Sequence, residues 1–314
     1  MKNSVPTFIM LVGLPGSGKS YFANKLKKLD NFVICSSDEL REELFGSYDV
    51  QDRNNQLFYE LHNRIKQNLK DGKNVIYDAT NISKKKRKSF LTNELKSICC
   101  VKKCICIMTP YEDCIYQNSI REKSVPNEVI KKMYSNWSPP NYNEGWDDIE
   151  IEFHYVNTVP RDFSFFQFFY GKVNACSIDH DNPHHIDTIG DHCVRAYRYI
   201  LNNYPNNTNL AIAALLHDIG KPFTKSRIKF NGDIDSISHY YNHQNCGAYD
   251  SMFYLKFDNY SNDSMIYISN LIYEHMRPFS AWQTTQSKEK DMLKFDKEFF
   301  NDLEKLHNAD ISSH

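Results

Sequence analysis

The sequence predicts an α/β domain, a parallel sheet with helices on both faces, followed by an all-α domain. Two observations carry this prediction. In the first half of the chain, short apolar runs alternate with segments of helical periodicity, whereas almost everything beyond Pro160 has the helical period. We therefore expect two domains, residues 1–160 and residues 161–314.

The expected elements of the first domain follow one another in a regular order. Four short apolar runs with β-branched residues predict strands: TFIMLVGL, FVICSS, NVIYDAT and CICIM. Other segments predict helices: KSYFANKLKKL, NQLFYELHNRIKQNLKDG, KKRKSFLTNEL and VPNEVIKKMYSNW. An alternating segment, IEIEFHYV, predicts a last strand before Pro160. Such strand–helix alternation is typical of a parallel sheet covered on both faces.

The second domain is expected to consist of helices. The segments with helical period are IGDHCVRAYRYILNNY, NLAIAALLHD, CGAYDSMFYLKF, SMIYISNLIYEHM and KEFFNDLEKLHNAD. The sequence contains no internal repeat and no low-complexity tract, so a repeat architecture is not expected.

The bulk composition narrows the class of protein. The 41% of hydrophobic residues can form ample core, and a formal net charge of -1 gives no global positive surface for nucleic acid. Neither a secretory signal nor an apolar run of membrane-spanning length is visible. The chain has nine cysteines, an odd number, and their spacing is not that of a small disulfide-bonded domain. We therefore expect reduced thiols in a cytoplasmic protein with no membrane contact.

Four cysteines crowd the segment ICCVKKCIC: Cys99, Cys100, Cys104 and Cys106. A structural zinc site needs paired cysteines and a second pair of cysteines or histidines at fixed spacing, and the second pair is missing here. We therefore interpret the segment as a strand in which cysteine serves as a small apolar residue.

The stretch GLPGSGKS, from Gly13 to Ser20, matches the phosphate-binding pattern G-x-x-x-x-G-K-[ST] and lies between a predicted strand and a predicted helix. Glycines let successive backbone N–H groups converge on phosphate oxygens at a helix N-terminus. Lys19 would reach the outer phosphates, and the hydroxyl of Ser20 would ligate Mg²⁺. The residues expected to bind the nucleotide are Gly13, Pro15, Gly16, Ser17, Gly18, Lys19 and Ser20. The alternative is a glycine-rich turn without nucleotide.

The segment SSDELREELFG places Asp38 at the carboxyl end of the second predicted strand, where ligands of open α/β sheets bind. A carboxylate there would accept the proton of an attacking hydroxyl, and Arg41 would reach an adjacent phosphate. Asp38 is equally suited to cap the helix that begins beside it, and the spacing does not decide between these roles.

The run KKKRK, from Lys84 to Lys88, concentrates positive charge on a predicted helix. A solvated helix face is the default interpretation. The alternative is a contact strip for the backbone of a polynucleotide.

The segment from about Thr7 to Ile149 resembles the P-loop polynucleotide 5′-kinases and, more broadly, the zeta-toxin-like kinases. The matching motifs are GLPGSGKS, SSDELR, VIYDATN and NSIREKSVPNEVIKKM. The resemblance implies ATP and Mg²⁺ as cofactors and Asp38 as the general base. It also implies Arg41 as a clamp on the phosphate 3′ to the accepting hydroxyl, and Arg121 in a lid over the ATP phosphates.

One departure from that family concerns the lid. The family often has a second arginine shortly before the position of Arg121, where this chain has Gln117 and Asn118. The chain would therefore clamp ATP more weakly, or Lys123 would supply the missing charge.

The helical half carries His217 and Asp218 at the end of an apolar helix, directly before Gly220 and Pro222. Imidazole and carboxylate are the commonest ligands of divalent metals, and the remaining ligands are expected on neighbouring helices. The candidates are His192, His243, His275 and Asp310. A single histidine on an apolar helical face is usually only packed there, but this many positions on separate helices favour a metal site.

The region from about Asn174 to Asp310 resembles the HD phosphohydrolase superfamily, and LLHDIGKP, NHQNCGA and EHM are most similar to the HD domain of bacterial CCA-adding enzymes. The resemblance implies one metal on His192, His217, Asp218 and Asp310, with His243 and His275 as extra ligands of two-metal members that Asp218 bridges. This mixed ligand set favours Mn²⁺, Fe²⁺, Co²⁺, Ni²⁺ or Zn²⁺ over Mg²⁺.

Four further residues near that pair are candidates for contacts with phosphate. Lys221 would neutralise a substrate phosphate, or is an ordinary solvated lysine. His180, His184 and His185 would contact phosphate, or belong to a polar loop, and the sequence favours neither role.

One chain would thus combine a module that adds phosphate with one that removes it, and healing of broken RNA ends is the economical hypothesis. The kinase would phosphorylate a 5′-OH end of RNA or DNA. The HD module would hydrolyse a 2′,3′-cyclic phosphate or a 2′- or 3′-phosphate, and a separate ligase would seal the ends. Three alternatives stay open: a small-molecule or nucleotide kinase fused to an HD nucleotide phosphohydrolase, a toxin-like kinase acting on a nucleotide sugar, and a nucleotide-binding regulatory module with an inactive HD half.

Overall fold

The computed structural model describes the chain except for residues 1–4, 51, 157–176, 182–186 and 314. The chain forms two compact units. The first comprises Met1–Met133 and Pro140–Thr158, and the second comprises Tyr134–Pro139 and Val159–His314. The short segment Tyr134–Pro139 thus belongs to the helical unit by its contacts, although the chain on both sides of it belongs to the first unit.

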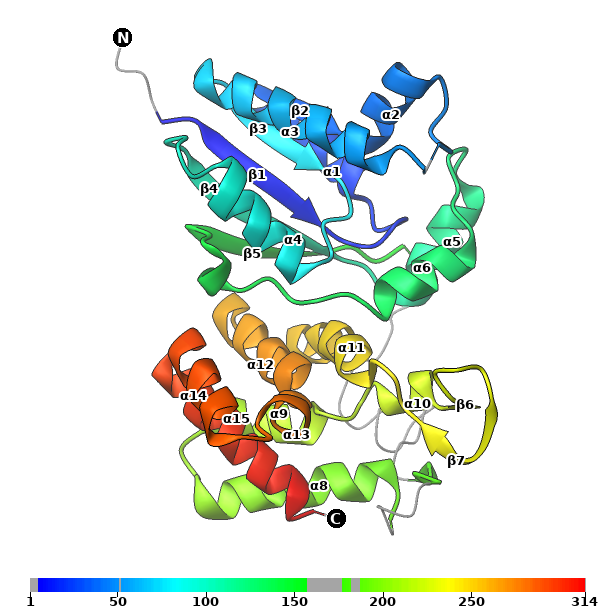
Figure 1. Cartoon of the computed structure of the whole chain (residues 1–314), viewed down its shortest axis with the longest axis vertical. Coiled ribbons are helices and arrows are strands. Elements are labelled where there is room, and N and C mark those ends of the chain that lie inside the picture. The colour runs from blue at the N-terminus through cyan, green and yellow to red at the C-terminus, as the bar shows by residue number, and fades with distance from the viewer. Residues whose placement is uncertain (1–4, 51, 157–176, 182–186, 314) are drawn as a thin grey trace. The chain divides into compact units, whose positions relative to one another are not determined.

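The first unit is built on a five-stranded sheet of order β2-β3-β1-β4-β5, in which every neighbouring pair is parallel (Figure 1). The strands are β1 Thr7–Val12, β2 Phe32–Ser36, β3 Asn74–Asp78, β4 Val101–Met108 and β5 Asp148–Phe153. All five predicted strands are present, and the predicted parallel α/β fold of this half is confirmed. A central parallel strand is buried on both faces, which explains why β1 is an uninterrupted apolar run.

Helices cover both faces of this sheet. The helices are α1 Lys19–Leu29, α2 Ser37–Phe45, α3 Asn54–Lys70, α4 Lys84–Ser89, α5 Tyr111–Ile120 and α6 Asn127–Tyr134, with a π-helix over Phe90–Glu94 and a 3₁₀ turn over Tyr142–Glu144. Alternate residues of β1 point to opposite faces. Ile9 and Leu11 pack with Ala23 of α1, whereas the ring of Phe8 lies 5.5 Å from that of Phe90 in the π-helix.

The cysteine-rich segment behaves as the sequence predicts. Cys104 and Cys106 are fully buried in β4, and burial raises the pKa of the Cys106 thiol to about 12. Among the residues that the structure describes, no cysteine takes part in a cluster of metal-ligating side chains. These two thiols therefore serve as apolar core groups.

The run KKKRK forms α4, but its residues do not share one environment. Lys85, Lys86 and Lys88 are exposed, whereas Arg87 is 1% exposed. The Arg87 guanidinium donates from Nε and Nη2 to the two carboxylate oxygens of Glu144, over 2.8 and 2.7 Å. For Arg87 both interpretations from the sequence were wrong, because this side chain faces inward and joins α4 to the turn before β5 in a buried, two-pronged ion pair.

The second unit consists mainly of helices, which confirms the fold class predicted for this half. They are α8 Ile189–Asn203, α9 Thr208–Leu216, α10 Lys221–Thr224, α11 His243–Phe257, α12 Asn262–Glu274, α13 Arg277–Ala281, α14 Thr285–Lys294 and α15 Lys297–Ile311. Helices α8, α9, α11, α12 and α15 pack on one another around side chains such as Ile200, Leu271 and Leu306, which are fully buried. In the described ranges, no helix combines the length and apolar character that a membrane span requires.

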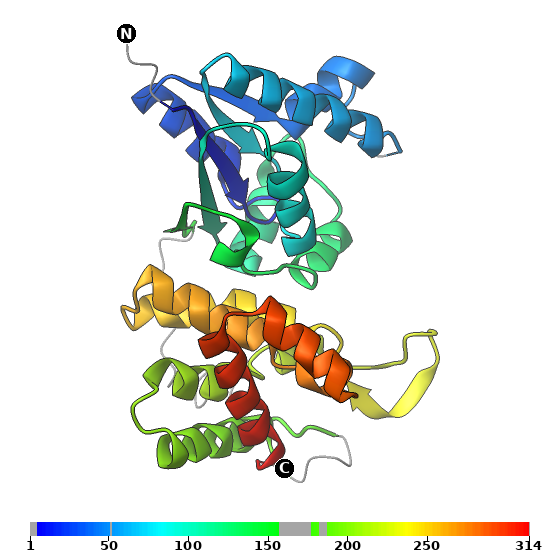
Figure 2. The same cartoon turned by 60° about the vertical axis from the view of Figure 1, so that its left-hand side comes forward.

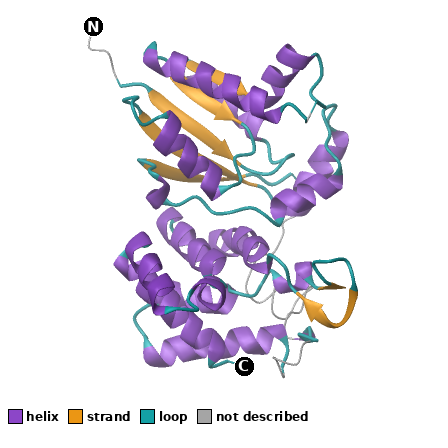
Figure 3. Cartoon of the chain, viewed as in Figure 1, coloured by secondary structure: helices purple, strands orange, loops and turns teal. Residues whose placement is uncertain are grey.

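A small hairpin departs from the all-helical expectation. Strands β6 Ser226–Ile228 and β7 Ile234–His239 pair antiparallel between α10 and α11 (Figures 2 and 3). The segment IDSISH alternates apolar and polar residues with the period of a strand, and Asn231-Gly232 supplies a common hairpin turn. Figure 2 shows the hairpin extending away from the helices of its own unit.

Candidate functional site

The loop from Gly13 to Ser20 connects β1 to α1 at the carboxyl edge of the sheet. Gly16 has a positive φ of 80°, and a Cβ atom there would lie 2.3 Å from the carbonyl oxygen of Cys114, so only glycine fits. The other predicted nucleotide-binding residues of the loop lie in the same turn: Pro15, Ser17, Gly18 and Lys19. The arrangement leaves the N-terminus of α1 available for an anion, as phosphate binding requires.

Lys19 and Ser20 meet an acidic residue at the end of the neighbouring strand. Lys19 is buried and its ammonium donates to the carbonyl of Leu14 over 2.7 Å. The hydroxyl of Ser20 donates to Asp78 Oδ2 over 2.6 Å. A hydroxyl and a carboxylate form the all-oxygen donor set that Mg²⁺ prefers, so these two residues fit a nucleotide-bound Mg²⁺.

The electrostatics of this site couple Lys19 to Asp78. Burial lowers the pKa of Lys19, and the charge of Asp78 acts against that change. Burial likewise raises the pKa of Asp78, opposed by Lys19 and by the hydrogen bond from Ser20. The sequence motif VIYDATN contains Asp78, but the motif alone did not indicate a role for this residue. Its position at the carboxyl end of the strand beside β1 was the available signal.

The acceptor side of the site lies on α2. Ser36, rather than Asp38, caps this helix, because its hydroxyl accepts from the N–H of Glu39. The Asp38 side chain is 58% exposed and lies 3.4 Å from Nη1 of Arg41. The cap role considered for Asp38 is thus filled by another residue, and its carboxylate faces solvent.

The side chain of Arg41 is mostly buried, and a hydrogen bond fixes its position. Its side chain is 8% exposed, and Nη2 donates to Asn54 Oδ1 over 2.8 Å. Its Nε is buried and has no hydrogen-bond partner among the described residues. A buried, unsatisfied guanidinium nitrogen beside an exposed carboxylate fits a group that awaits an anionic ligand.

Arg121 follows α5 and enters the same region. Its Nε donates to Asn118 Oδ1 over 3.1 Å, and Asn118 also accepts from the N–H of Val125. Burial lowers the pKa of Arg121, and the charge of Asp38 opposes this effect. Asn118 therefore does not replace a second lid arginine but shapes the loop that carries Arg121. Lys123 pairs with Glu42 of α2.

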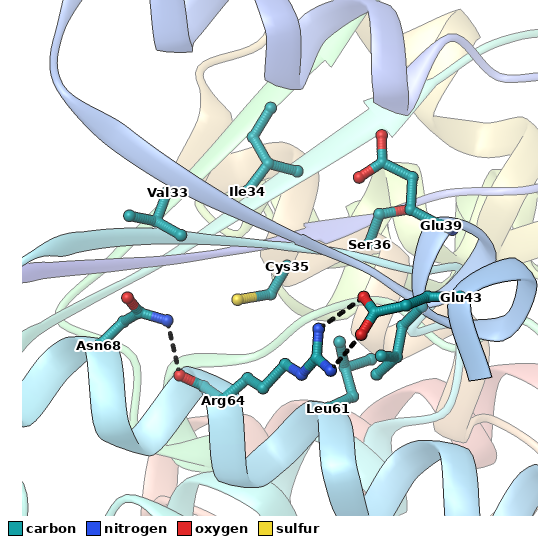
Figure 4. Close-up of a pocket in the computed structure, with 10 residues that line it drawn as sticks. Val33, Ile34, Cys35, Ser36, Glu39, Glu43, Leu61, Arg64 and Asn68 are labelled. Carbon is teal, nitrogen blue, oxygen red and sulfur yellow. Dashed lines mark hydrogen bonds and ion pairs between the residues drawn. The ribbon is translucent and has the colours of Figure 1, made fainter.

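A separate cavity of about 210 Å³ lies along edge strand β2, between α2 and α3, and contains no residue of the phosphate loop (Figure 4). Its walls include Arg64, which forms a two-pronged ion pair with Glu43 across the cavity. Burial raises the pKa of Cys35 in its floor to about 11, so this thiol is protonated at neutral pH. Arg64, the one cation among the residues that line the cavity, is already paired with Glu43, so the cavity offers no free cation for phosphate.

In the second unit, the six residues predicted to ligate metal converge from five helix ends or faces. His192 lies on α8, His217 ends α9, His243 begins α11, His275 ends α12, and Asp310 lies on α15, while Asp218 follows His217. All six are at most 6% exposed. They form two groups: His192, His217 and Asp310; and Asp218, His243 and His275.

Asp218 connects the two groups through its two carboxylate oxygens. Its Oδ2 lies 3.4 Å from His217 Nε2 and 3.6 Å from His192 Nε2. Its Oδ1 lies 3.2 Å from His243 Nε2 and 3.7 Å from His275 Nε2. One carboxylate oxygen toward each group is the arrangement of a bridging ligand between two cations.

The hydrogen bonds of the imidazoles identify which ring nitrogens face the centre. In all four rings, Nδ1 lies within 2.6–3.1 Å of a backbone carbonyl: Ser313 for His192, Ala214 for His217, Tyr240 for His243 and Ile272 for His275. A carbonyl only accepts, so each Nδ1 carries a proton and each ring turns inward its Nε2, whose lone pair is the one that can bind a metal.

These inward lone pairs fit a pair of divalent cations. The Nε2 atoms of His192 and His217 lie 3.0 Å apart, and those of His243 and His275 lie 3.1 Å apart. Two neutral imidazoles with facing lone pairs repel each other unless a cation or a proton lies between them. Backbone carbonyls that accept from Nδ1 and so fix each ring are typical of metal-bound histidines, so the donor set fits the metals expected from the sequence.

The backbone explains why a glycine follows the His217-Asp218 pair. A Cβ atom on Gly220 would lie 2.0 Å from the carbonyl oxygen of His243 and 2.6 Å from the N–H nitrogen of Gly247. Glycine therefore lets the turn after α9 press directly against the start of α11. This contact brings Asp218 next to His243.

Lys221 lies at this centre and is not an ordinary solvated lysine. Its ammonium is 2.6 Å from Asp218 Oδ2 and 5.5 Å from the ring centre of Tyr240, and the residue is 7% exposed. Burial raises the pKa of Asp218, but Lys221 and His217 outweigh it and hold the pKa well below the ordinary value. His180 is buried with its ring 5.6 Å from that of His192, while His184 and His185 lie outside the described residues.

Comparison with known proteins supports both halves of this description. Residues 8–140 match the model of an AAA domain, and residues 189–302 match the model of the HD domain. The chain therefore combines a P-loop kinase domain with an HD domain, as the sequence motifs indicate.

Individual relatives match only parts of the chain. A stretch of 157 residues, 46% of this chain, is 33% identical to the L-seryl-tRNA(Sec) kinase of Methanococcus maripaludis and covers 58% of it. A solved structure described as the Pnkp1/Rnl/Hen1 RNA repair complex matches at 25% identity with a TM-score of 0.38, over 41% of this chain and 43% of that chain. The chain thus spans about half the length of these relatives.

Proposed function

We propose that this chain heals broken RNA ends, with a 5′-hydroxyl kinase in residues 1–160 and a metal-dependent phosphohydrolase in residues 161–314. The observation that carries the proposal is the pairing of two opposite sites in one chain. One is an exposed carboxylate, Asp38, beside a phosphate loop, and the other is a centre of four histidines and two aspartates joined through Asp218. Together the two reactions would convert a 5′-hydroxyl end and a cyclic-phosphate end into a 5′-phosphate and a free hydroxyl, which a separate ligase would join.

In the kinase, the groups on this chain divide the work of in-line phosphoryl transfer. Asp38 accepts the proton of the 5′-hydroxyl as its oxygen attacks the γ-phosphorus, and the bond from that phosphorus to the ADP oxygen breaks. Arg41 holds the neighbouring 3′-phosphate, and Lys19 and Arg121 neutralise the transferring phosphoryl group. Ser20 and Asp78 would hold Mg²⁺, which would supply further charge neutralisation.

The curated relative supports an acceptor that is attached to RNA. Its name, L-seryl-tRNA(Sec) kinase, describes transfer of phosphate to an aminoacylated tRNA, and the identity of 33% extends over 157 residues of this chain. The same observation favours a second candidate acceptor, the seryl group of a charged tRNA. The two acceptors differ in the group next to the hydroxyl. Only the 5′ end of a polynucleotide carries a neighbouring 3′-phosphate that Arg41 can bind.

In the HD unit, divalent metals supply an activated water and charge neutralisation when they are bound. The six residues would hold the metals, with Asp218 facing both groups of ligands. Lys221, buried against Asp218, is placed to bind a phosphate oxygen of the substrate and to stabilise its charge as the P–O bond breaks. The substrate end is a 2′,3′-cyclic phosphate or a 2′- or 3′-phosphate.

End-group analysis of one RNA tests both proposed activities. The full chain is incubated with ATP, Mg²⁺, Mn²⁺ or Ni²⁺ and an RNA that carries a 5′-hydroxyl and a 2′,3′-cyclic phosphate. We expect a 5′-phosphate and a 3′ terminus without phosphate. Phosphorylation of seryl-tRNA but not of the RNA end would favour the second acceptor, and no change at either end would overturn the proposal.

A further inference from the structure

The β6–β7 hairpin exposes apolar side chains to an extent that its fold does not require. Phe230 near its tip is 90% exposed, Ile234 is 84% exposed and Ile228 is 55% exposed. The hairpin occupies the chain between the ligands Asp218 and His243 (Figure 1). An exposed aromatic ring on a protruding element marks a binding surface when it is part of a larger arrangement.

Here the exposed ring continues into an aromatic row. Phe230 lies edge-on to Tyr241, with ring centres 4.9 Å apart. Tyr241 in turn stacks on His239, with ring centres 5.3 Å apart and planes within 6° of each other. We call these three side chains, Phe230, Tyr241 and His239, the aromatic row.

The aromatic row includes Tyr241, which lies on the segment that leads into the metal-ligating centre. Tyr241 is two residues before His243, so its backbone lies within about 8 Å of that ligand. The intervening region carries Tyr240, whose ring lies 5.5 Å from the ammonium of Lys221. Tyr240, which contacts Lys221, thus lies in the chain between two members of the row, and an RNA chain with its terminal phosphate at Lys221 would pass near the row.

Basic side chains alternate along the same hairpin. Lys225, Arg227 and Lys229 are all exposed, in the run KSRIKF. Arg227 pairs with Asp181, and Lys229 pairs with Asp235 at 3.4 Å. Ion pairs at the surface are weak because water screens them, so a phosphate backbone can compete for these cations.

From this arrangement we propose that the hairpin is a stacking platform for the bases of single-stranded RNA next to the phosphate end that the HD unit processes. The bases stack on the aromatic row and the backbone follows Lys225, Arg227 and Lys229. Aromatic rings on which bases stack, together with cations that follow the backbone, are the combination by which proteins bind single strands without sequence preference. This inference rests on the function proposed above. The alternative is that the hairpin is a docking site for a protein or a membrane, and the test must distinguish the two.

The test compares a polymeric with a minimal substrate in the full-length protein. The substrates are a short RNA ending in a 2′,3′-cyclic phosphate and a 2′,3′-cyclic mononucleotide, which has no neighbouring bases. For Phe230→Ala we expect the ratio of kcat/KM values, RNA over mononucleotide, to fall about tenfold through KM, as loss of one stacked base predicts. Phe230→Trp should keep the ratio, and Phe230→Leu should not.

Ile234→Ala is the matched control, because this residue is almost as exposed on the same hairpin but has no ring. An unchanged ratio in Phe230→Ala, with active wild-type protein, would overturn the inference and leave a protein or membrane partner for the hairpin. If the wild type hydrolyses neither substrate, this result contradicts the proposed phosphohydrolase activity and not the inference about the hairpin. The hairpin is then tested by fluorescence anisotropy with the same RNA, and equal affinity of wild type and Phe230→Ala would overturn the inference.

Discussion

The carboxylate of Asp38 is available to act as a base because a neighbouring residue caps the helix in its place. Because the Ser36 hydroxyl caps α2, the Asp38 side chain is free of that task and stays 58% exposed beside Arg41. A general base must remain accessible to its proton donor, and an exposed carboxylate at the carboxyl edge of a parallel sheet satisfies this condition.

Asp38→Asn keeps the shape of the side chain and removes its basicity. We expect kcat for phosphorylation of a 5′-hydroxyl RNA to fall by roughly 10²–10⁴-fold, since that is the usual contribution of a general base. The Kd for ATP should change little because Lys19 and Ser20 are intact, and hydrolysis at the HD site should continue. Radiolabel transfer and ATP titration measure the two quantities. An unchanged kcat would remove Asp38 from the mechanism.

Substitution of Asp218 should lower the metal content of the protein more than substitution of His275. Asp218 faces both groups of ligands, whereas His275 faces one. We expect about two transition-metal ions per chain in the wild type, about one in His275→Ala, and less than one in Asp218→Asn. Elemental analysis of protein loaded with Mn²⁺ or Ni²⁺ and then desalted gives the ratio. Equal metal content in all three proteins would contradict the assignment of Asp218 as a bridge.

Arg87 shows how a buried charge can be hidden in an apparently solvated run. Breaking a buried ion pair by removing one partner costs about 3–5 kcal/mol, because the other charge is left uncompensated. We therefore expect Arg87→Ala to lower the free energy of unfolding of the kinase unit by about that amount. Lys88→Ala, one residue away on the exposed face, should change it by less than about 0.5 kcal/mol. Urea titration of both variants decides whether the Glu144 pair has this role.

At the scale of elements, a tight backbone contact positions the metal-ligating centre. The turn after α9 approaches the start of α11 so closely that a methyl group at Gly220 would lie 2.0 Å from a backbone oxygen. Gly220→Ala must therefore move one element away from the other, which separates Asp218 from His243. We expect reduced metal content and loss of phosphate hydrolysis, while the kinase activity of the same preparation persists. Full metal content would show that the turn can shift without disturbing the ligands.

Much of this arrangement could be predicted from the sequence, because it depends on local patterns. The alternation of strands and helices, the phosphate loop from Gly13 to Ser20 and the six candidate ligands were all recognisable as motifs. Long-range pairing was not recognisable: the contact of Ser20 with Asp78 spans 58 residues and that of Arg87 with Glu144 spans 57. The sequence also concealed the hairpin, since its short strands lie between strong helical segments.

At the scale of the whole molecule, the two sites rely on different ligands for their order. The phosphate loop would bind Mg²⁺ and ATP, and hydrogen bonds join its residues to one another and to the end of β3. The HD centre collects inward-facing lone pairs from helices that are far apart in the sequence, and their mutual repulsion is relieved only by a cation or a proton. Each ligand should therefore stabilise the unit that binds it and leave the other unit unaffected.

Differential scanning calorimetry of the full chain tests this independence. ATP with Mg²⁺ should raise the melting temperature of one transition, and Mn²⁺ should raise that of another. A ligand at 100 times its Kd stabilises by about 2.7 kcal/mol, which is enough to separate the transitions by several degrees. Asp38→Asn should retain both shifts, and Asp218→Asn should lose the Mn²⁺ shift alone. A single transition that responds equally to both ligands would mean that the two units unfold together, so that metal at the HD centre would also govern the stability of the kinase.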